Sequence, residues 1–382
     1  MNKKLLVTMI GVALTVGAGA ANAIESKLSG QVGRAVMRAD DGVSSELHHV
    51  DAADKTRFRF TGTGELIPGV KAGVNFEAEF VSNGSSSVTN YQKSQPRDTT
   101  NPAATANAPA SPDLDERHLA VYLDGGFGRV TLGQTAGAAD GATETDLSGT
   151  GIFASMTIAD WGGAMNFCTA ADATTATAVG TGTNCSGPSV SGVINNLDLE
   201  GRYDVLRYDS PALGPVKLSL STGNTRAGNG ATEFALRFSS DLGGIGKIEG
   251  ALGKSTEKLA DTSGPGTKDD ETTGASVAWL HGSGLNLALA ISERDVDTNR
   301  KRKFNYLKAG YKMGQHAVSL EMGKGKDQAA LNDEAEVMGL AYVYSPVKWA
   351  ELFAGWRVYS LDRPGTTFSD IDVLAVGAYF KF

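Results

Sequence analysis

The sequence predicts an all-β fold, a transmembrane barrel of sixteen antiparallel strands. Three observations lead to it: apolar and polar residues alternate over long segments, short turns alternate with longer polar connections, and no run of 18 or more apolar residues follows the N-terminal leader. Such a chain has no helix that could cross a bilayer. A sheet that crosses one must close on itself, because lipid offers no hydrogen-bond partners to an open edge.

The first 23 residues have the pattern of a secretory signal peptide. Lys3 and Lys4 precede an apolar run that begins at Leu5, and Ala21 and Ala23 form a small-residue cleavage site. We expect cleavage after Ala23 and a single barrel domain over residues 24–382. The net charge is −8 for the whole chain and −10 without the two leader lysines, which leaves no basic surplus for a nucleic-acid partner.

Residues 56–80 show the alternation most clearly. In TRFRFTGTGEL (56–66) and VKAGVNFEAEF (70–80), every second residue is apolar or glycine, and the residues between them are polar or small. With residues 67–69 as a three-residue turn, paired positions sum to 136. This register pairs Phe60 with Phe76, Gly62 with Val74 and Leu66 with Val70 on the apolar face, and Arg57 with Glu79, Arg59 with Glu77 and Glu65 with Lys71 on the polar face.

The remaining strands follow from the same period and from the turns between them. Seven short turns, near residues 67, 125, 212, 243, 282, 313 and 345, alternate with eight longer connections. Strands of about 10 to 12 residues suit an oblique crossing of a bilayer. They are predicted to begin near residues 27, 55, 70, 116, 128, 201, 216, 232, 246, 272, 285, 303, 316, 334, 350 and 371.

The last strand, IDVLAVGAYFKF, places Leu374, Val376, Phe380 and Phe382 on one face and ends the chain on phenylalanine. Together with the leader and the strand count, it gives the chain its resemblance to the general, trimeric porins of Gram-negative outer membranes. Segments 28–37 (LSGQVGRAVM), 57–62 (RFRFTG), 117–133 (RHLAVYLDGGFGRVTLG) and 205–211 (VLRYDSP) are similar to porin strands.

The resemblance implies a homotrimer in the cell outer membrane, with a third loop folded inward to narrow a water-filled channel. Its surroundings would be outer-membrane lipid and lipopolysaccharide. Phe380 and Phe382 would belong to the C-terminal signature that the barrel-insertion machinery reads. Small hydrophilic solutes and ions would diffuse through passively, and a transverse field between acidic and basic side chains would select among them.

The basic side of the constriction is carried over from the family. Arg57 matches the pore arginine of the second strand and Arg117 that of the fourth, with Arg59 and Arg207 as nearby candidates. By alternation Arg117 shares a face with Leu119 and Val121, so it reaches the lumen only if a β-bulge intervenes.

A ladder of charge is also predicted on this wall. Glu79 and Glu77 stand opposite Arg57 and Arg59 in the predicted hairpin. The arginines therefore have two interpretations: cross-strand pairing and a role in the permeation field.

The acidic side is predicted on the third loop, at about residues 134–200. A connection of this length needs a role of its own. It carries Asp140, Glu144, Asp146 and Asp160 and has no Lys or Arg. Cys168 and Cys185 lie in the exported part of the chain, where a disulfide between them is expected. The alternative is an exposed, variable loop that the disulfide protects.

Other functions were weighed against a general channel. A channel selective for a sugar, phosphate or dicarboxylate is the main alternative, and an outer-membrane enzyme or an adhesin are further ones. The sequence has no nucleophile motif or nucleotide loop, so we expect no enzyme, no cofactor and no metal. The net charge and the acidic loop predict a weak preference for cations. The basic run RKRK (300–303) is either a solvated face or a contact for lipopolysaccharide phosphates.

Overall fold

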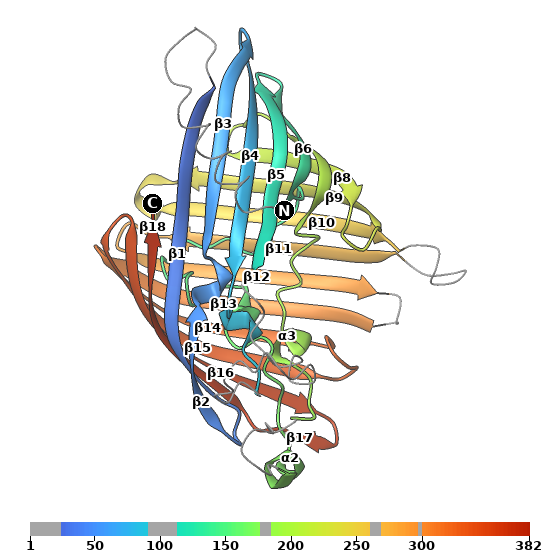
Figure 1. Ribbon diagram of the computed structural model, residues 1–382, viewed down its shortest axis with the longest axis vertical. Helices are drawn as coiled ribbons and strands as arrows, with labels where there is room; N and C mark the ends of the chain where they lie inside the picture. Colours follow the sequence, from blue (N-terminus) through green and yellow to red (C-terminus); the bar gives the residue numbers. More distant parts are fainter. Residues whose placement is uncertain (1–23, 91–112, 176–184, 260–268, 297–299) are drawn as a thin grey trace.

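The computed structural model describes residues 24–90, 113–175, 185–259, 269–296 and 300–382. The expected leader lies outside these residues. Nearly all of the described chain is antiparallel sheet (Figure 1). The strands are β1 (Glu25–Asp40), β2 (Ser45–Asp51), β3 (Arg57–Ile67), β4 (Val70–Val81), β5 (Asp113–Gly125), β6 (Gly128–Ala136), β7 (Arg202–Asp209), β8 (Val216–Asn224), β9 (Gly230–Asp241), β10 (Lys247–Lys258), β11 (Asp270–Leu280), β12 (Leu285–Val296), β13 (Arg300–Met313), β14 (His316–Lys326), β15 (Glu334–Val347), β16 (Ala350–Arg363), β17 (Thr366–Thr367) and β18 (Ile371–Lys381).

The sheet closes because the first and last strands pair. β1 runs antiparallel to β18, and Gly30 and Phe382 exchange two main-chain hydrogen bonds of 2.9 Å. Two short strands, β2 and β17, do not add to the ring. β2 and β3 lie end to end along β1 and so occupy one position, and β17 lies along β16 at the rim, just before β18. The result is the predicted closed barrel of sixteen antiparallel strands.

The predicted hairpin register is confirmed from Arg57 to Glu65, where every pair sums to 136. At its turn end the prediction was wrong, because Ile67 rather than Leu66 pairs with Val70. A bulge between Glu65 and Ile67 absorbs the extra residue. The turn therefore contains only Pro68 and Gly69, and Gly69 has the positive φ of 79° that favours glycine.

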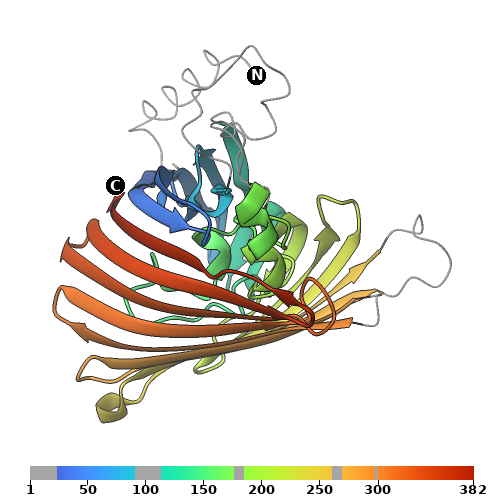
Figure 2. The same ribbon diagram turned by 90° about the horizontal axis from the view of Figure 1, so that it is seen from below.

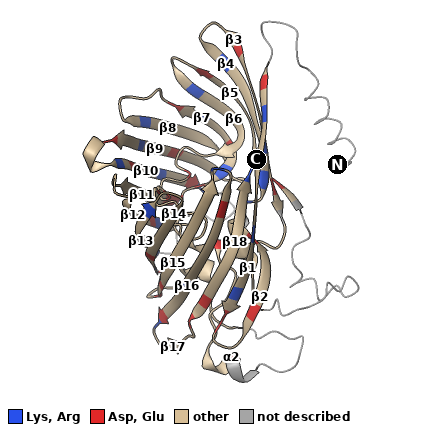
Figure 3. Cartoon of the chain, turned by 90° about the vertical axis from the view of Figure 1, so that its left-hand side faces the viewer, with Lys and Arg blue, Asp and Glu red and all other residues tan. Residues whose placement is uncertain are grey.

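The side chains sort by face along each strand. On β18, Leu374 and Val376 are 46% and 58% exposed, whereas Val373 and Ala375, which alternate with them, are fully buried. The exposed apolar set faces outward, where a transmembrane barrel meets lipid. Charged residues occur along the strands as well as in the connections (Figure 3).

The connection between β6 and β7, residues 137–201, is called loop 3 below. It contains the helices α2 (Ala170–Thr175) and α3 (Val190–Val193) and a 3₁₀ turn, η4 (Ile158–Asp160). Most of the loop lies inside the ring of strands (Figure 2). None of the described helices is long and apolar enough to cross a membrane. Two more 3₁₀ turns, η1 (Ala52–Asp54) and η2 (Ser85–Ser87), lie near β2, and η5 (Gly243–Ile245) lies between β9 and β10.

Loop 3 gives the barrel a hydrophobic core. Phe153, Ile158 and Trp161 are completely buried against inward side chains of the strands from β11 round to β2. The inner wall on this side is therefore mainly apolar, with a few buried charged residues, which differs from the polar lumen expected all round. This explains why β15 alternates poorly in the sequence, since both of its faces contact apolar surroundings.

Candidate channel constriction

Three arginines converge on one buried carboxylate on the wall that loop 3 leaves free. We call Arg57, Arg59 and Arg117 the arginine cluster. Glu77 is 1% exposed, and its carboxylate accepts hydrogen bonds from Arg57 at 3.2 Å, from Arg117 at 2.8 Å and from Arg59. Glu79 accepts from Arg117. Three positive charges thus share two carboxylates.

The predicted pairing is confirmed for Arg59 and Glu77. It was wrong for Arg57 and Glu79, which are cross-strand neighbours in register but not ion-pair partners. The Arg57 side chain reaches diagonally to Glu77, and Arg117 bonds to Glu79 instead. Long side chains span such diagonal positions readily.

A β-bulge turns Arg117 into the lumen. The β4–β5 ladder pairs Glu77 with His118 and Ala78 with Glu116, so Arg117 is the unpaired extra residue. Beyond the bulge Leu119 and Val121 face outward and are more than half exposed. The β-bulge that Arg117 needs in order to reach the lumen is therefore present.

Arg207 lies apart from the arginine cluster and holds the start of loop 3. Its guanidinium bonds both carboxylate oxygens of Asp209 at 2.8 and 3.0 Å and donates to the carbonyls of Ala136 and Gly137. Arg237 acts in the same way on the carbonyls of Ala138 and Asp140, at 2.8 and 2.7 Å. The role of Arg237 was not predicted from the sequence, where nothing distinguishes it from other residues of a strand.

The four loop carboxylates have different surroundings. Asp146 forms an ion pair of 2.8 Å with Lys308, which is completely buried in the wall, so this acid serves to anchor the loop. Asp160 accepts a hydrogen bond from Thr157 at 2.9 Å. Burial raises the pKa of Asp160, while the charges of Lys55 and other cations act in the opposite direction.

Asp140 and Glu144 lie near one another and near Asp198. Burial raises the pKa of Asp140 to about 6, and the charge of Asp198 adds to the effect. Burial raises the pKa of Glu144 to about 8, again with Asp198 and Asp140 contributing. Glu144 is therefore largely protonated at neutral pH, and the loop carries less negative charge than its sequence suggests.

A buried ion pair fixes the middle of loop 3. Arg357 and Glu321 are both completely buried and bond at 2.6 Å. Arg357 also donates to the carbonyl of Ile158 at 2.8 Å and to that of Ser155 at 3.2 Å. The hydroxyl of Tyr359 donates to the carbonyl of Trp161 at 2.6 Å. No sequence motif marks these residues, because their partners lie about 200 positions earlier in the chain.

Cys168 and Cys185 form the expected disulfide. It lies at the rim rather than beside the arginine cluster. The carbonyl of Cys168 accepts from the amide of Ser369, between β17 and β18, and Asn90 bonds both Asp41 and Asn166 beside it. This arm of loop 3 continues into α2, which lies beyond the end of β17 in Figure 1. Part of the loop therefore points outward, as the alternative interpretation held.

The free wall of the lumen is basic. A cavity of about 410 Å³ is lined by β3 to β8, and its charged residues are four cations and one carboxylate: Arg59, Arg129, Arg207, Lys217 and Asp209. Polar residues such as Thr61, Asn75 and Thr131 complete the lining. The lumen on this side is therefore lined by polar and charged side chains.

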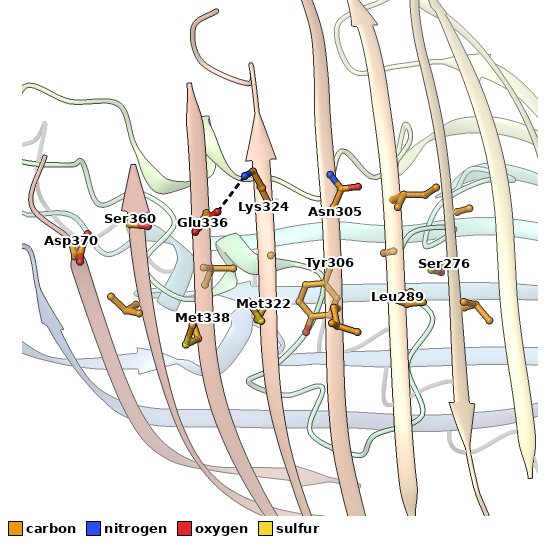
Figure 4. Close-up of a pocket in the computed structure, with 18 residues that line it drawn as sticks. Ser276, Leu289, Asn305, Tyr306, Met322, Lys324, Glu336, Met338, Ser360 and Asp370 are labelled. Carbon is orange, nitrogen blue, oxygen red and sulfur yellow. Dashed lines mark hydrogen bonds and ion pairs between the residues drawn. The ribbon is translucent and has the colours of Figure 1, made fainter. Parts of the chain in front are cut away.

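A second hollow, of about 750 Å³, lies on the outer surface over β11 to β16 (Figure 4). Its middle is apolar, with Leu289, Met322 and Met338, and Lys324 and Glu336 form an ion pair at 3.3 Å above them. Because this surface faces away from the lumen, the hollow is not part of the channel.

The comparisons with known proteins agree with this geometry. A family model described as "Gram-negative porin" matches residues 11–362. The chain belongs to the Gram-negative porin family. No curated protein matches it.

Solved porins have the same fold. The anion-selective porin of Comamonas acidovorans has a TM-score of 0.63 and 17% identity, over 94% of this chain and all of that one. The outer-membrane channel DcaP of Acinetobacter baumannii has a TM-score of 0.56 and 14% identity, over 96% of this chain and 99% of that one. OmpT of Vibrio cholerae, solved in a trimer form, has a TM-score of 0.56 and 12% identity, over 94% of this chain and all of that one.

Family and fold together identify a channel for passive diffusion in the outer membrane, not an enzyme. The porin family and the sixteen-stranded fold confirm the resemblance read from the sequence.

We predict that Arg357→Met loosens loop 3. Removing one partner of a buried ion pair costs about 3–5 kcal/mol, because the other charge remains buried. The carbonyls of Ser155 and Ile158 lose their donor in the same variant. Planar-bilayer recordings should show larger, flickering single-channel currents. Arg363→Met is the control: it removes an arginine from the same strand, but one that pairs with Asp333 at the rim. Identical traces for the two variants would contradict the anchoring role.

We also predict that ion selectivity depends on pH. Since the pKa of Asp140 is raised to about 6 and that of Glu144 to about 8, both lose protons as the pH rises from 5 to 9. The loop then gains negative charge, and the permeability ratio of cation to anion should rise over this range. Glu144→Gln should remove the part of the rise above pH 7. Glu65→Gln, at an exposed turn position, is the control and should keep the whole profile.

Proposed function

We propose that small hydrophilic solutes and ions pass between loop 3 and the wall that carries the arginine cluster. The observation that supports this most directly is the division of the lumen: loop 3 packs on an apolar half, and the other half is polar and basic. Arg57, Arg59 and Arg117 would form the basic side of the constriction, with Glu77 and Glu79 as the ladder that holds them in place. Asp160, and Glu144 and Asp140 in their ionised forms, would form the acidic side.

For ion selectivity, the lumen supports a weak preference for anions. The weak cation preference expected from the net charge stays a prediction. However, four of the five charged residues around the cavity are cations, and the pKa values of Asp140, Glu144 and Asp160 on the loop are raised. Local charge in a narrow, poorly screened passage affects permeation more than the charge of the whole protein. The same basic wall favours a phosphate or a dicarboxylate over a sugar, should the channel be selective for one substrate.

A homotrimer is supported by charges on the outer face of β1. Arg34 and Arg38 alternate with Val32 and Val36, which are 41% and 44% exposed, so all four face outward. An arginine that faces lipid costs about 2–4 kcal/mol at the middle of the bilayer and less toward its interfaces. Asp40 pairs with Arg38 at 2.8 Å. The face would therefore contact a neighbouring subunit rather than lipid.

Lipid would cover the outer face over β11 to β16. The hollow over β11 to β16 has an apolar middle and a polar upper edge, an arrangement that fits an acyl chain with its headgroup toward the rim (Figure 4). Lipopolysaccharide is the candidate, because the longer connections at this rim face the cell exterior in such barrels.

Export and assembly complete the proposal. Residues 1–23 would be removed after Ala23, leaving residues 24–382 as a single barrel domain. The barrel-insertion machinery would recognise the last strand, where Phe380 and Phe382 are 45% and 68% exposed on the outer face. Sequencing the N-terminus of the protein from outer membranes tests the cleavage.

The decisive experiment is single-channel recording of the purified protein in a planar bilayer. We expect ohmic currents that close in steps of three, one step for each subunit. A reversal potential across a potassium chloride gradient should report a weak chloride preference. A potassium preference would instead favour the expectation from net charge, and the absence of any conductance would overturn the proposed channel.

We predict that Arg57→Ala raises the flux of small solutes and shifts selectivity toward cations. The change removes a positive charge and a large side chain from the constriction, while Arg59 and Arg117 still neutralise Glu77. Liposome swelling measures the flux and a reversal potential measures the shift. Arg226→Ala, between β8 and β9, is the control and should behave like the native protein. If conductance and selectivity stay unchanged in both variants, Arg57 serves only to pair with Glu77.

A further inference from the structure

The basic run at residues 300–303 divides between the two faces of β13. Arg300 and Arg302 lie on the inward side with the buried Phe304, whereas Lys301 and Lys303 lie on the outer face. The lysines are satisfied there: Glu293 accepts from Lys301 at 3.0 Å and lies 3.6 Å from Lys303. The two interpretations of this run in the sequence therefore apply only to its lysines.

A third arginine stands beside the inward pair. Arg294 on β12 is the cross-strand neighbour of Arg302, and we call Arg294, Arg300 and Arg302 the mouth triad. Like charges directly opposite one another in a sheet are destabilising. The sequence nevertheless places two guanidinium groups in this relation, with a third one two residues away.

The triad is only partly neutralised within the described part of the chain. Arg294 bonds Asp270 at 2.9 Å and Glu257 at 3.4 Å. Arg300 donates to the carbonyl of Ala329. Arg302 forms no ion pair with any described residue. The Nε atoms of all three arginines are buried and lack a hydrogen-bond partner among the described residues, which is costly for a donor.

The mouth triad lies at the outer end of the barrel. It lies at the end of β12 and β13 that is remote from the short turns, and thus at the outer mouth. One step below Arg294 on the same face, Ser292 donates to the carbonyl of Asn196 in loop 3 at 2.6 Å. The triad therefore lies at the outer mouth, directly above the contact between β12 and loop 3.

We propose that the mouth triad binds a small oxyanion of two or more charges, such as phosphate or a dicarboxylate, before it enters the channel. The inference rests on the proposed channel and adds a class of solute and a first binding site to it. Guanidinium groups present planar pairs of donors that match phosphate and carboxylate oxygens. A bound dianion would also relieve the repulsion between Arg294 and Arg302.

The test is the effect of inorganic phosphate, and separately of succinate, on single-channel currents carried by potassium chloride. Added on the side of the longer loops at neutral pH, at least one of these anions should reduce the current with a saturable half-effect concentration. In the double variant Arg300→Gln, Arg302→Gln this concentration should rise about tenfold or more, the loss expected for charge-assisted hydrogen bonds. A response to phosphate alone or to succinate alone identifies the preferred oxyanion.

The control is the double variant Lys301→Gln, Lys303→Gln. It also removes two positive charges from residues 300–303, but on the outer face of β13. It should keep the native half-effect concentration. Equal weakening in both double variants, or no response of the native protein to either anion, would overturn the proposal. Heat-dependent migration in electrophoresis verifies that both variants are folded barrels.

Calorimetric titration of phosphate and succinate into the detergent-solubilised trimer measures binding without conductance. A protein that conducts but binds neither anion contradicts the mouth triad alone. A protein that forms no channel contradicts the proposed passage. Binding that is lost in the arginine variant and kept in the lysine variant supports the triad.

Discussion

The packing of loop 3 on one half of the inner wall is the constraint on which the rest of the structure depends. Side chains such as Phe153 and Trp161 need an apolar partner, and the inward residues of β11 to β18 supply it. This contact occupies one side of the lumen, and the proposed passage lies along the basic side. The buried cations Lys308 and Arg357 complete the contact because they satisfy loop carbonyls that would otherwise lack donors.

On the basic side of the lumen, the arginines outnumber the carboxylates that bind them. Glu77 and Glu79 hold three arginines, and Asp209 holds Arg207. The four arginines are therefore fixed in position by three carboxylates, which leaves one positive charge in excess. A wall built this way combines a rigid shape with a net positive potential, and both properties matter to a solute that passes within a few ångströms.

Much of the barrel could be predicted from alternation alone. Residues 57–65 pair with 71–79 as expected, since a slip of one residue would put Phe58 in the lumen and Arg57 in lipid. The bulge at Arg117 could be stated only as a condition, because an extra residue leaves no mark on composition. The apolar inner wall could not be predicted, since alternation identifies two faces without showing what covers each. The anchors Arg237, Lys308 and Arg357 depend on contacts remote in sequence. The inward position of loop 3 came from the resemblance to porins.

The buried pair of Arg357 and Glu321 also determines the order in which the molecule can be assembled. Ile158 is synthesised 199 residues before the arginine that binds its carbonyl, so the middle of loop 3 lacks this anchor until β16 exists. The seam between β1 and β18 cannot form before the final residues arrive, and it then encloses the loop. Long-range contacts of this kind form slowly. The barrel therefore cannot close, and the middle of the loop cannot be anchored, before the C-terminal strands are present.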